Sequence, residues 1–263
     1  MADTSLSRIA LVSDLHGNVT AFHAVLTDLE RRGIQRVINL GDVIGKGPRG
    51  RECIALTRRH CDVTVRGNWD AFISDPTSVL QEAGRWWRDE LTEDDRQWLA
   101  ALPNSHDLQL SGRRIRLVHA SAISEHVRVH FHHSDDEFIG MFENTPFTGD
   151  GPVPTMVGYG DIHDAYLEVH EGRTLFNVGS VGNPLDEPTA SYVIMEGIEE
   201  GDPTDPIGLQ FVRVPYAIEE EIAAARACGM PEVDAYAVEL RTAIYRGRHA
   251  ELGLHPEDRP VSR

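Results

Sequence analysis

Residues 9–16 read IALVSDLH, an apolar run that ends directly in Asp14 and His16. A short apolar run of this kind is typical of a buried strand, which we place at 8–13. Helices and further strands then alternate along the chain, with expected helices at 18–32 and 49–59 and expected strands at 36–40 and 62–65. Strands that alternate with helices predict a parallel sheet whose strand ends meet at one edge.

Residues of the type that bind metal ions follow five successive predicted strands. In chain order they are Asp14 and His16, Gly41-Asp42, Gly67-Asn68, His119 and His163. At one edge of a sheet these side chains can converge, as a two-metal hydrolytic site requires. Mixed carboxylate, imidazole and carboxamide ligands favour Mn, Fe or Zn over calcium.

Two details of this pattern predict how the ligands are arranged. Asp14 and His16 lie two residues apart, so on an extended segment they would point to the same side. Asp42 stands in the glycine-rich stretch 41–47, where the backbone can approach ions and phosphate closely, and it suits a bridge between two ions.

The second half of the chain predicts β-hairpins and further strands, then helices. The expected hairpins are 106–110 with 113–119 and 165–169 with 173–177, the strands 190–196 and 208–214, and the helical stretches 78–101 and 217–247. We expect one domain over 1–263, two packed sheets with helices outside and a C-terminal helical tail at about 217–263. The long connection 120–153 carries four histidines and an expected short helix near 134–143, and it is interpreted as a lid over the site.

Composition excludes several classes of partner. The formal charge of −17 argues against general binding to nucleic acid or anionic membranes. Three cysteines form no CxxC pair and indicate a reducing compartment, and no apolar run approaches a membrane span. The N-terminal run is too short for a signal peptide, so a cytoplasmic location is expected.

The ordered motifs resemble those of the calcineurin-like metallophosphoesterases. They read Asp14-Leu15-His16, Gly41-Asp42 through Gly47, Gly67-Asn68-Trp69-Asp70, His119, and Gly160-Asp161-Ile162-His163. The loop at 177–184, NVGSVGNP, is similar to one in a small bacterial branch that includes YfcE-like phosphodiesterases and diadenosine tetraphosphate hydrolases. The resemblance implies a four-layer αββα sandwich of two mixed sheets.

It also implies a site with two divalent ions, Mn being the first choice and Fe, Zn, Ni or Mg the alternatives. One ion would take Asp14, His16, Asp42 and His163. The other would take Asp42, Asn68, His119 and Asp161. A metal-bound hydroxide would then attack phosphorus, with Asp42, Asn68 and His119 as catalytic residues and Asp70 orienting a neighbouring ligand.

Two positions depart from the family pattern. Asp161 stands where the family has His, so the second ion is expected to bind differently or more weakly. Trp69 stands where many relatives have a His credited with protonating the leaving group. A lid histidine, water or a good leaving group would then have to compensate.

The expected substrate is a small phosphodiester or nucleotide. Candidate residues for binding it are Arg66, His130, His132 and Ser180, although Ser180 could instead belong to a tight loop packed below the site. The alternatives are a catalytically weak binding or scaffold module on the same fold, favoured by Asp161, and a nuclease, disfavoured by the negative charge. The substrate's identity and the oligomeric state stay open.

Overall fold

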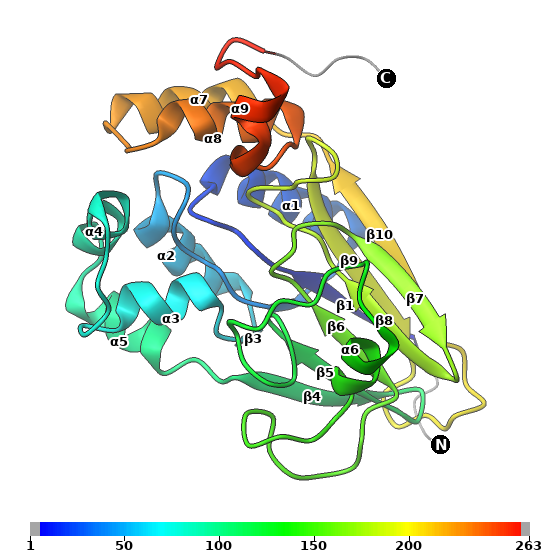
Figure 1. The fold of residues 1–263 in the computed structure, drawn as a ribbon. Coiled ribbons are helices and arrows are strands. Elements are labelled where there is room, and N and C mark those ends of the chain that lie inside the picture. Colours follow the sequence, from blue (N-terminus) through cyan, green and yellow to red (C-terminus); the bar gives the residue numbers. More distant parts are fainter. Residues whose placement is uncertain (1–5, 259–263) are drawn as a thin grey trace.

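The computed structural model describes residues 6–258 and contains two five-stranded sheets (Figure 1). The first has the order β10-β9-β1-β2-β3 and the second the order β4-β5-β6-β8-β7. The strands of the first sheet are β1 (Ser7–Val12), β2 (Arg36–Asn39), β3 (Val63–Thr64), β9 (Ala190–Gly197) and β10 (Gly208–Val214). Those of the second are β4 (Ser105–Leu110), β5 (Arg113–Val118), β6 (Met156–Tyr159), β7 (Tyr166–His170) and β8 (Arg173–Asn177).

Both sheets are mixed. β1 pairs in parallel with β2 and antiparallel with β9, while β6 pairs in parallel with both β5 and β8. The parallel pairs place the loops after β1, β2, β5 and β6 at neighbouring sheet ends, which is where the polar motifs lie. The expected hairpins β4–β5 and β7–β8 are confirmed by their antiparallel registers.

The helices follow the predicted order, with one addition. They are α1 (Val19–Arg32), α2 (Gly50–His60), α3 (Asn68–Ser74), α4 (Glu82–Asp89), α5 (Glu93–Ala100), α6 (Asp135–Gly140), α7 (Ile218–Ala227), α8 (Val233–Thr242), the 3₁₀ helix η1 (Arg246–Arg248) and α9 (His249–Leu252). Helix α3 was not predicted, because its seven residues are too few to show a helical period. Within the described residues no helix is both long and apolar enough to cross a membrane.

Side chains of strand β1 alternate between the two faces of the first sheet and so contribute to two apolar layers. Ile9 and Leu11 point into the apolar core between the two sheets, and Ala10 and Val12 point into the core between the first sheet and its helices. All four side chains are at most 1% exposed. Burial on both faces accounts for an apolar run without polar alternation.

The connection 120–153 forms the outer layer on the second sheet. Val129, Phe138, Met141 and Phe142 pack with Val157 and other residues of the sheet in one buried cluster. This layer, two sheets and the helices beside the first sheet make the expected four-layer sandwich. The interpretation of the segment as a lid stays a prediction.

Candidate metal centre

The loops after the strands hold their polar residues in an unusual backbone conformation. Five site residues have a positive φ, namely Asp14 (54°), His16 (45°), Asp42 (54°), Asp161 (63°) and His163 (64°). Left-handed conformations of residues other than glycine are costly and gather at functional sites. The premise that Asp14 and His16 share an extended segment was wrong. β1 ends at Val12, and two left-handed residues turn the chain so that both side chains still meet.

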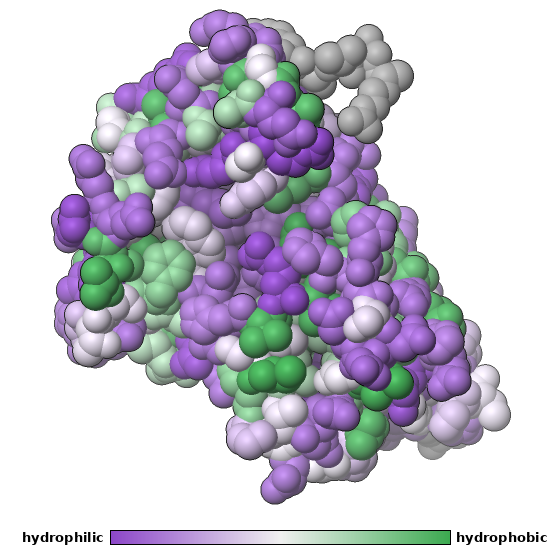
Figure 2. All heavy atoms as spheres, in the orientation of Figure 1, coloured by the Kyte–Doolittle hydropathy of each residue, from purple (hydrophilic) through white to green (hydrophobic). Residues whose placement is uncertain are grey.

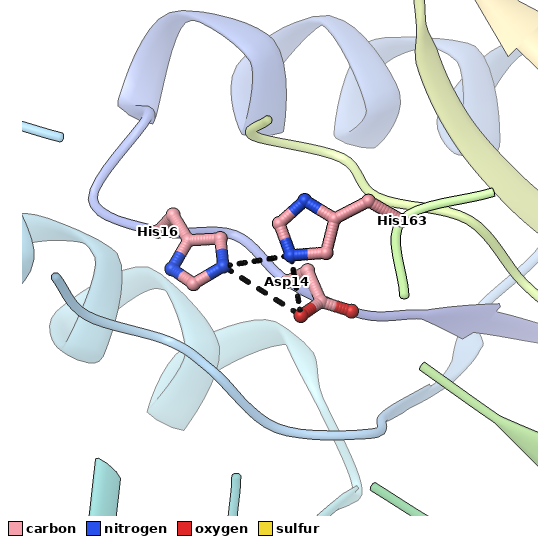
Figure 3. Close-up of side chains that lie close together, drawn as sticks. All are labelled: Asp14, His16 and His163. Carbon is pink, nitrogen blue, oxygen red and sulfur yellow. Dashed lines mark hydrogen bonds and ion pairs between the residues drawn. The ribbon is translucent and has the colours of Figure 1, made fainter. Parts of the chain in front are cut away.

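Asp14, His16 and His163 form the first group of potential ligands (Figure 3). The Nε2 atoms of His16 and His163 lie 3.6 Å and 3.2 Å from Asp14 Oδ1, and 3.1 Å from each other. All three side chains are at most 3% exposed. Their ligand atoms lie within 4.8 Å of one another, a spacing that can hold one ion.

Asp14, Asp42 and His119 form a second group beside the first. Asp42 Oδ1 lies 3.5 Å from His119 Nε2, and Asp42 Oδ2 lies 3.6 Å from His16 Nε2. The two oxygens of Asp42 therefore face different histidines, as a bridging carboxylate would. Asn68 Oδ1 lies 3.2 Å from His119 Nε2, which brings this residue to the same group.

Backbone carbonyls orient all three histidines. In each ring Nδ1 faces a carbonyl oxygen as its hydrogen-bond donor, which leaves Nε2 directed at the carboxylates. The acceptors are Ile44 for His16 (3.2 Å), Leu40 for His119 (2.8 Å) and Asn183 for His163 (2.5 Å). Such a bond fixes the ring and the tautomer of a metal-binding histidine.

Charge is finely balanced among these buried groups. Burial raises the pKa of Asp42 well above its usual range. Burial also opposes ionisation of Asp14, but the charge of His163 and the close approach of both histidine rings outweigh it and hold the pKa of Asp14 well below its usual range. Burial lowers the pKa of His16 to about 3, with Lys46 adding to the effect. For His119 burial is outweighed by Asp42 and Asp14, which raise its pKa to about 9.

The surroundings of Asp42 hold this residue in place. Asp70 accepts hydrogen bonds from the backbone N–H groups of Asp42 (2.8 Å), Val43 (3.0 Å) and Gly67 (3.0 Å). A Cβ atom on Gly67 would lie 2.1 Å from Asp42 Oδ1, so no larger residue fits there. Asp70 therefore holds the loop of Asp42 in place; that it thereby orients a metal ligand stays a prediction.

The two groups fit divalent cations. Asp14 belongs to both groups, and its Oδ1 is buried and has no hydrogen-bond partner among the described residues. A buried carboxylate oxygen without a partner is costly, and a cation supplies the missing interaction. Aspartate oxygens with histidine nitrogens are the ligands that Mn, Fe and Zn accept.

A cleft of about 1400 Å³ opens over the centre. His163, Lys46 and Trp69 line it, and so do Tyr245 and Arg248 of the C-terminal tail. Figure 2 shows the hollow, surrounded largely by hydrophilic surface, beneath the C-terminal helices. The tail is thus part of the wall that a substrate would meet.

The residues predicted to bind substrate lie in different places. His130 lines the cleft, whereas His132 packs its ring on Phe131. Arg66 is paired with Glu125 at 3.1 Å and donates to Asn104, and it does not line the cleft. For His130, His132 and Arg66 alike, a contact with substrate stays a prediction.

Ser180 is fully buried and belongs to the tight loop below the site. Its Oγ donates to the carbonyl of Asp14 (2.8 Å) and accepts from the backbone N–H of Asn183 (2.8 Å). Since Asn183 in turn binds the ring of His163, this loop positions two ligands. The structure therefore favours the alternative in which Ser180 supports the site from below.

Arg128 is a site residue that sequence reasoning missed. Its guanidinium binds both oxygens of Asp161 at 2.8 Å and lines the cleft. Asp161 lies at the border of the second group, with Oδ1 3.9 Å from His119 Nε2. No motif marks Arg128; the only signal is its place in the irregular segment between two ligand-bearing strands.

Comparison with known proteins agrees with the fold. Residues 8–200 match the Calcineurin-like phosphoesterase superfamily domain, so the chain belongs to that superfamily. The crystal structure of a metallophosphoesterase from Sphaerobacter thermophilus superposes with a TM-score of 0.68 at 27% identity, over 90% of this chain and 98% of that one. The family and the fold predicted from the motifs are confirmed.

Two further relatives span similar lengths. A hypothetical protein from Pyrococcus horikoshii shares the fold with a TM-score of 0.68 at 17% identity, over 86% of this chain and 95% of that one. An uncharacterized protein of Methanocaldococcus jannaschii is 29% identical over 229 residues, 81% of this chain and 90% of that protein. The family match ends at residue 200, so the C-terminal tail that lines the cleft lies beyond it.

Proposed function

We propose that the protein is a two-metal phosphoesterase that hydrolyses a small phosphodiester or nucleotide-type substrate, with Mn as the preferred ion. The observation that supports this most is the pair of adjacent buried Asp/His groups that share Asp14 at the base of a cleft. One group alone would fit a structural ion. Two groups with a common carboxylate fit the pair of ions that stabilises an in-line displacement at phosphorus.

The residues have distinct parts in this proposal. Asp14, His16 and His163 would hold one ion, and Asp42 would bridge to a second ion bound by His119 and Asn68. When bound, the ions would activate water and stabilise the charge that develops on the phosphoryl oxygens. Asp70 and the backbone carbonyls keep the ligands in position, so that the site is organised before substrate arrives.

Position 69 leaves the leaving group without an obvious acid. Trp69 lines the cleft beside His16, with ring centroids 5.8 Å apart, and its indole cannot supply a proton as a histidine would. His130 lines the same cleft and could take that part. A substrate with a good leaving group, such as a nucleotide phosphate, would need no such acid.

Metal content and activity test the proposal together. Manganese per chain would be measured in the purified protein after Mn loading, along with hydrolysis of bis-p-nitrophenyl phosphate, for the native chain, Asp42→Asn and the control Asp94→Asn. Asp94 is a surface residue paired with Arg58, so its variant should behave as the native chain. About two ions per chain and Mn-dependent turnover that Asp42→Asn loses would support the proposal. No bound ion and no turnover would favour a scaffold module.

A further inference from the structure

The pair formed by Arg128 and Asp161 stands beside the metal centre, at the position where the family pattern has a ligand histidine. Arg128 Nε and Nη2 each lie 2.8 Å from one oxygen of Asp161. The carboxylate is 4% exposed and the arginine side chain 48% exposed. One partner is therefore buried against the centre while the other reaches into the cleft.

The geometry leaves the outer edge of the guanidinium free. An arginine has five N–H donors, and this side-on pairing occupies one on Nε and one on Nη2. Within residues 6–258 no hydrogen bond is formed by Nη1. Nη1 and the second N–H of Nη2 thus form a forked pair of donors on a residue that lines the cleft, the arrangement that binds two oxygens of a phosphate.

Asp161 is also tied to the first group of ligands. Its backbone N–H donates to Asp14 Oδ2 at 3.1 Å, which fixes the loop relative to the centre. Both carboxylate oxygens face the arginine, and neither belongs to the two groups of atoms close enough to share an ion. A carboxylate held in this way can place the positively charged guanidinium of Arg128 at the edge of the centre without binding a metal ion itself.

We propose that Arg128 binds a non-bridging phosphoryl oxygen of the substrate and that Asp161 positions Arg128 instead of serving as a metal ligand. The inference rests on the proposed phosphoesterase function. The arginine–carboxylate pair would then take the place of the histidine that the family has at this position. The phosphate of the substrate would be held from one side by the metal centre and from the other by the guanidinium of Arg128. The ligand class is a phosphate monoester or diester.

Binding measurements separate this proposal from its alternatives. Manganese and inorganic phosphate would each be titrated by calorimetry into the native chain, Arg128→Gln, Asp161→Asn and the double variant. Phosphate would be titrated with and without Mn. Arg114→Gln is the matched control, because Arg114 also pairs with an aspartate, Asp107, through Nε and Nη2 but lies outside the cleft.

We expect Arg128→Gln to weaken phosphate binding by about 10- to 100-fold, the range for a hydrogen bond to a charged group. Asp161→Asn should weaken it severalfold and leave Mn stoichiometry and affinity unchanged. The double variant should be no worse than Arg128→Gln, since Asp161 acts through the arginine. The control should match the native chain.

Two results would overturn the inference. Loss of one Mn ion in Asp161→Asn would make Asp161 a ligand, as the family resemblance implies. Unchanged phosphate affinity in Arg128→Gln would reduce the pair to a contact that fastens the segment 120–153. If the native chain binds no Mn, the proposed function fails, and the metal-free phosphate titration still decides whether Arg128 binds phosphate.

Discussion

Glu239 of helix α8 connects the C-terminal tail to the candidate metal centre, and replacing it with Gln should destabilise the fold in a pH-dependent way. The side chain is fully buried. It accepts hydrogen bonds from Arg246 Nε (2.9 Å), Arg246 Nη2 (2.7 Å) and Asn183 Nδ2 (3.3 Å). Asn183 in turn holds the ring of His163. Glutamine can keep some of these bonds but removes the buried negative charge that faces the partly buried guanidinium of Arg246.

The contribution of Glu239 to the free energy of unfolding follows from its pKa. Burial alone would raise this pKa, but hydrogen bonds from Arg246 and the charge of Lys46 lower it from 4.5 to about 2. Because the pKa of Glu239 is lower in the folded state than in the unfolded state, its ionised carboxylate stabilises the fold. This stabilisation is present above the unfolded-state pKa of 4.5 and is lost as the pH falls toward 2. At about 1.4 kcal/mol for each tenfold change in proton affinity, the contribution is about 3 kcal/mol at pH 7 and roughly half of that at pH 3.

Urea unfolding of the native chain and Glu239→Gln at pH 7 and pH 3 measures this contribution. The difference in unfolding free energy should be about 3 kcal/mol at pH 7 and should shrink at pH 3. Glu232→Gln is the control, because Glu232 pairs with the same arginine from a half-exposed position and should contribute less than about 1 kcal/mol. An equal difference at both pH values would refute the assignment of the stability to the ionised carboxylate.

Three further outcomes can be measured. Gly67→Ala should lose Mn affinity by calorimetry, because the added Cβ would lie 2.1 Å from Asp42 Oδ1; wild-type affinity would contradict this. Mn at 100 times its Kd should stabilise the native chain by about 2.7 kcal/mol in thermal unfolding and should stabilise Asp42→Asn less; equal shifts would argue against Asp42 as a ligand. Ser180→Ala should lower stability by about 1–3 kcal/mol, since the buried N–H of Asn183 loses its partner and the carbonyl of Asp14 keeps only its bond from Gly182; a neutral result would mean that the loop relaxes.

Most of the architecture could be predicted because two simple signals were strong. The strands are buried on both faces, so they read as apolar runs, and the ligand residues follow them directly. Parallel pairing of β1 with β2 and of β5 with β6 then brings the strand ends together. This is why Asp14, Asp42 and His119 could be assigned to one centre although 105 residues separate the first from the last.

The local conformation of the centre could not be predicted in the same way. Asp14, His16 and Asp42 have left-handed φ values, although aspartate and histidine on their own prefer negative φ values. They are maintained by tertiary contacts, such as the N–H of Asp14 to the carbonyl of Gly41 (2.9 Å) and that of His16 to the carbonyl of Asp42 (2.9 Å). Backbone strain of this kind has no periodic signature in the sequence, and it is visible only once both loops are in place.

Arg128 shows a second limit of sequence patterns. Motif spacing identifies groups that the backbone of a sheet edge must present, because these lie at fixed distances from strands. Arg128 comes from an irregular connection and reaches Asp161 33 residues later. Its segment is held by Val129 and Phe138 packing on the second sheet, a surface that many sequences could cover. The candidate ligands are therefore set by the sheet edge, whereas the charge of Arg128 in the cleft depends on how the connection packs, and only the folded chain reveals it.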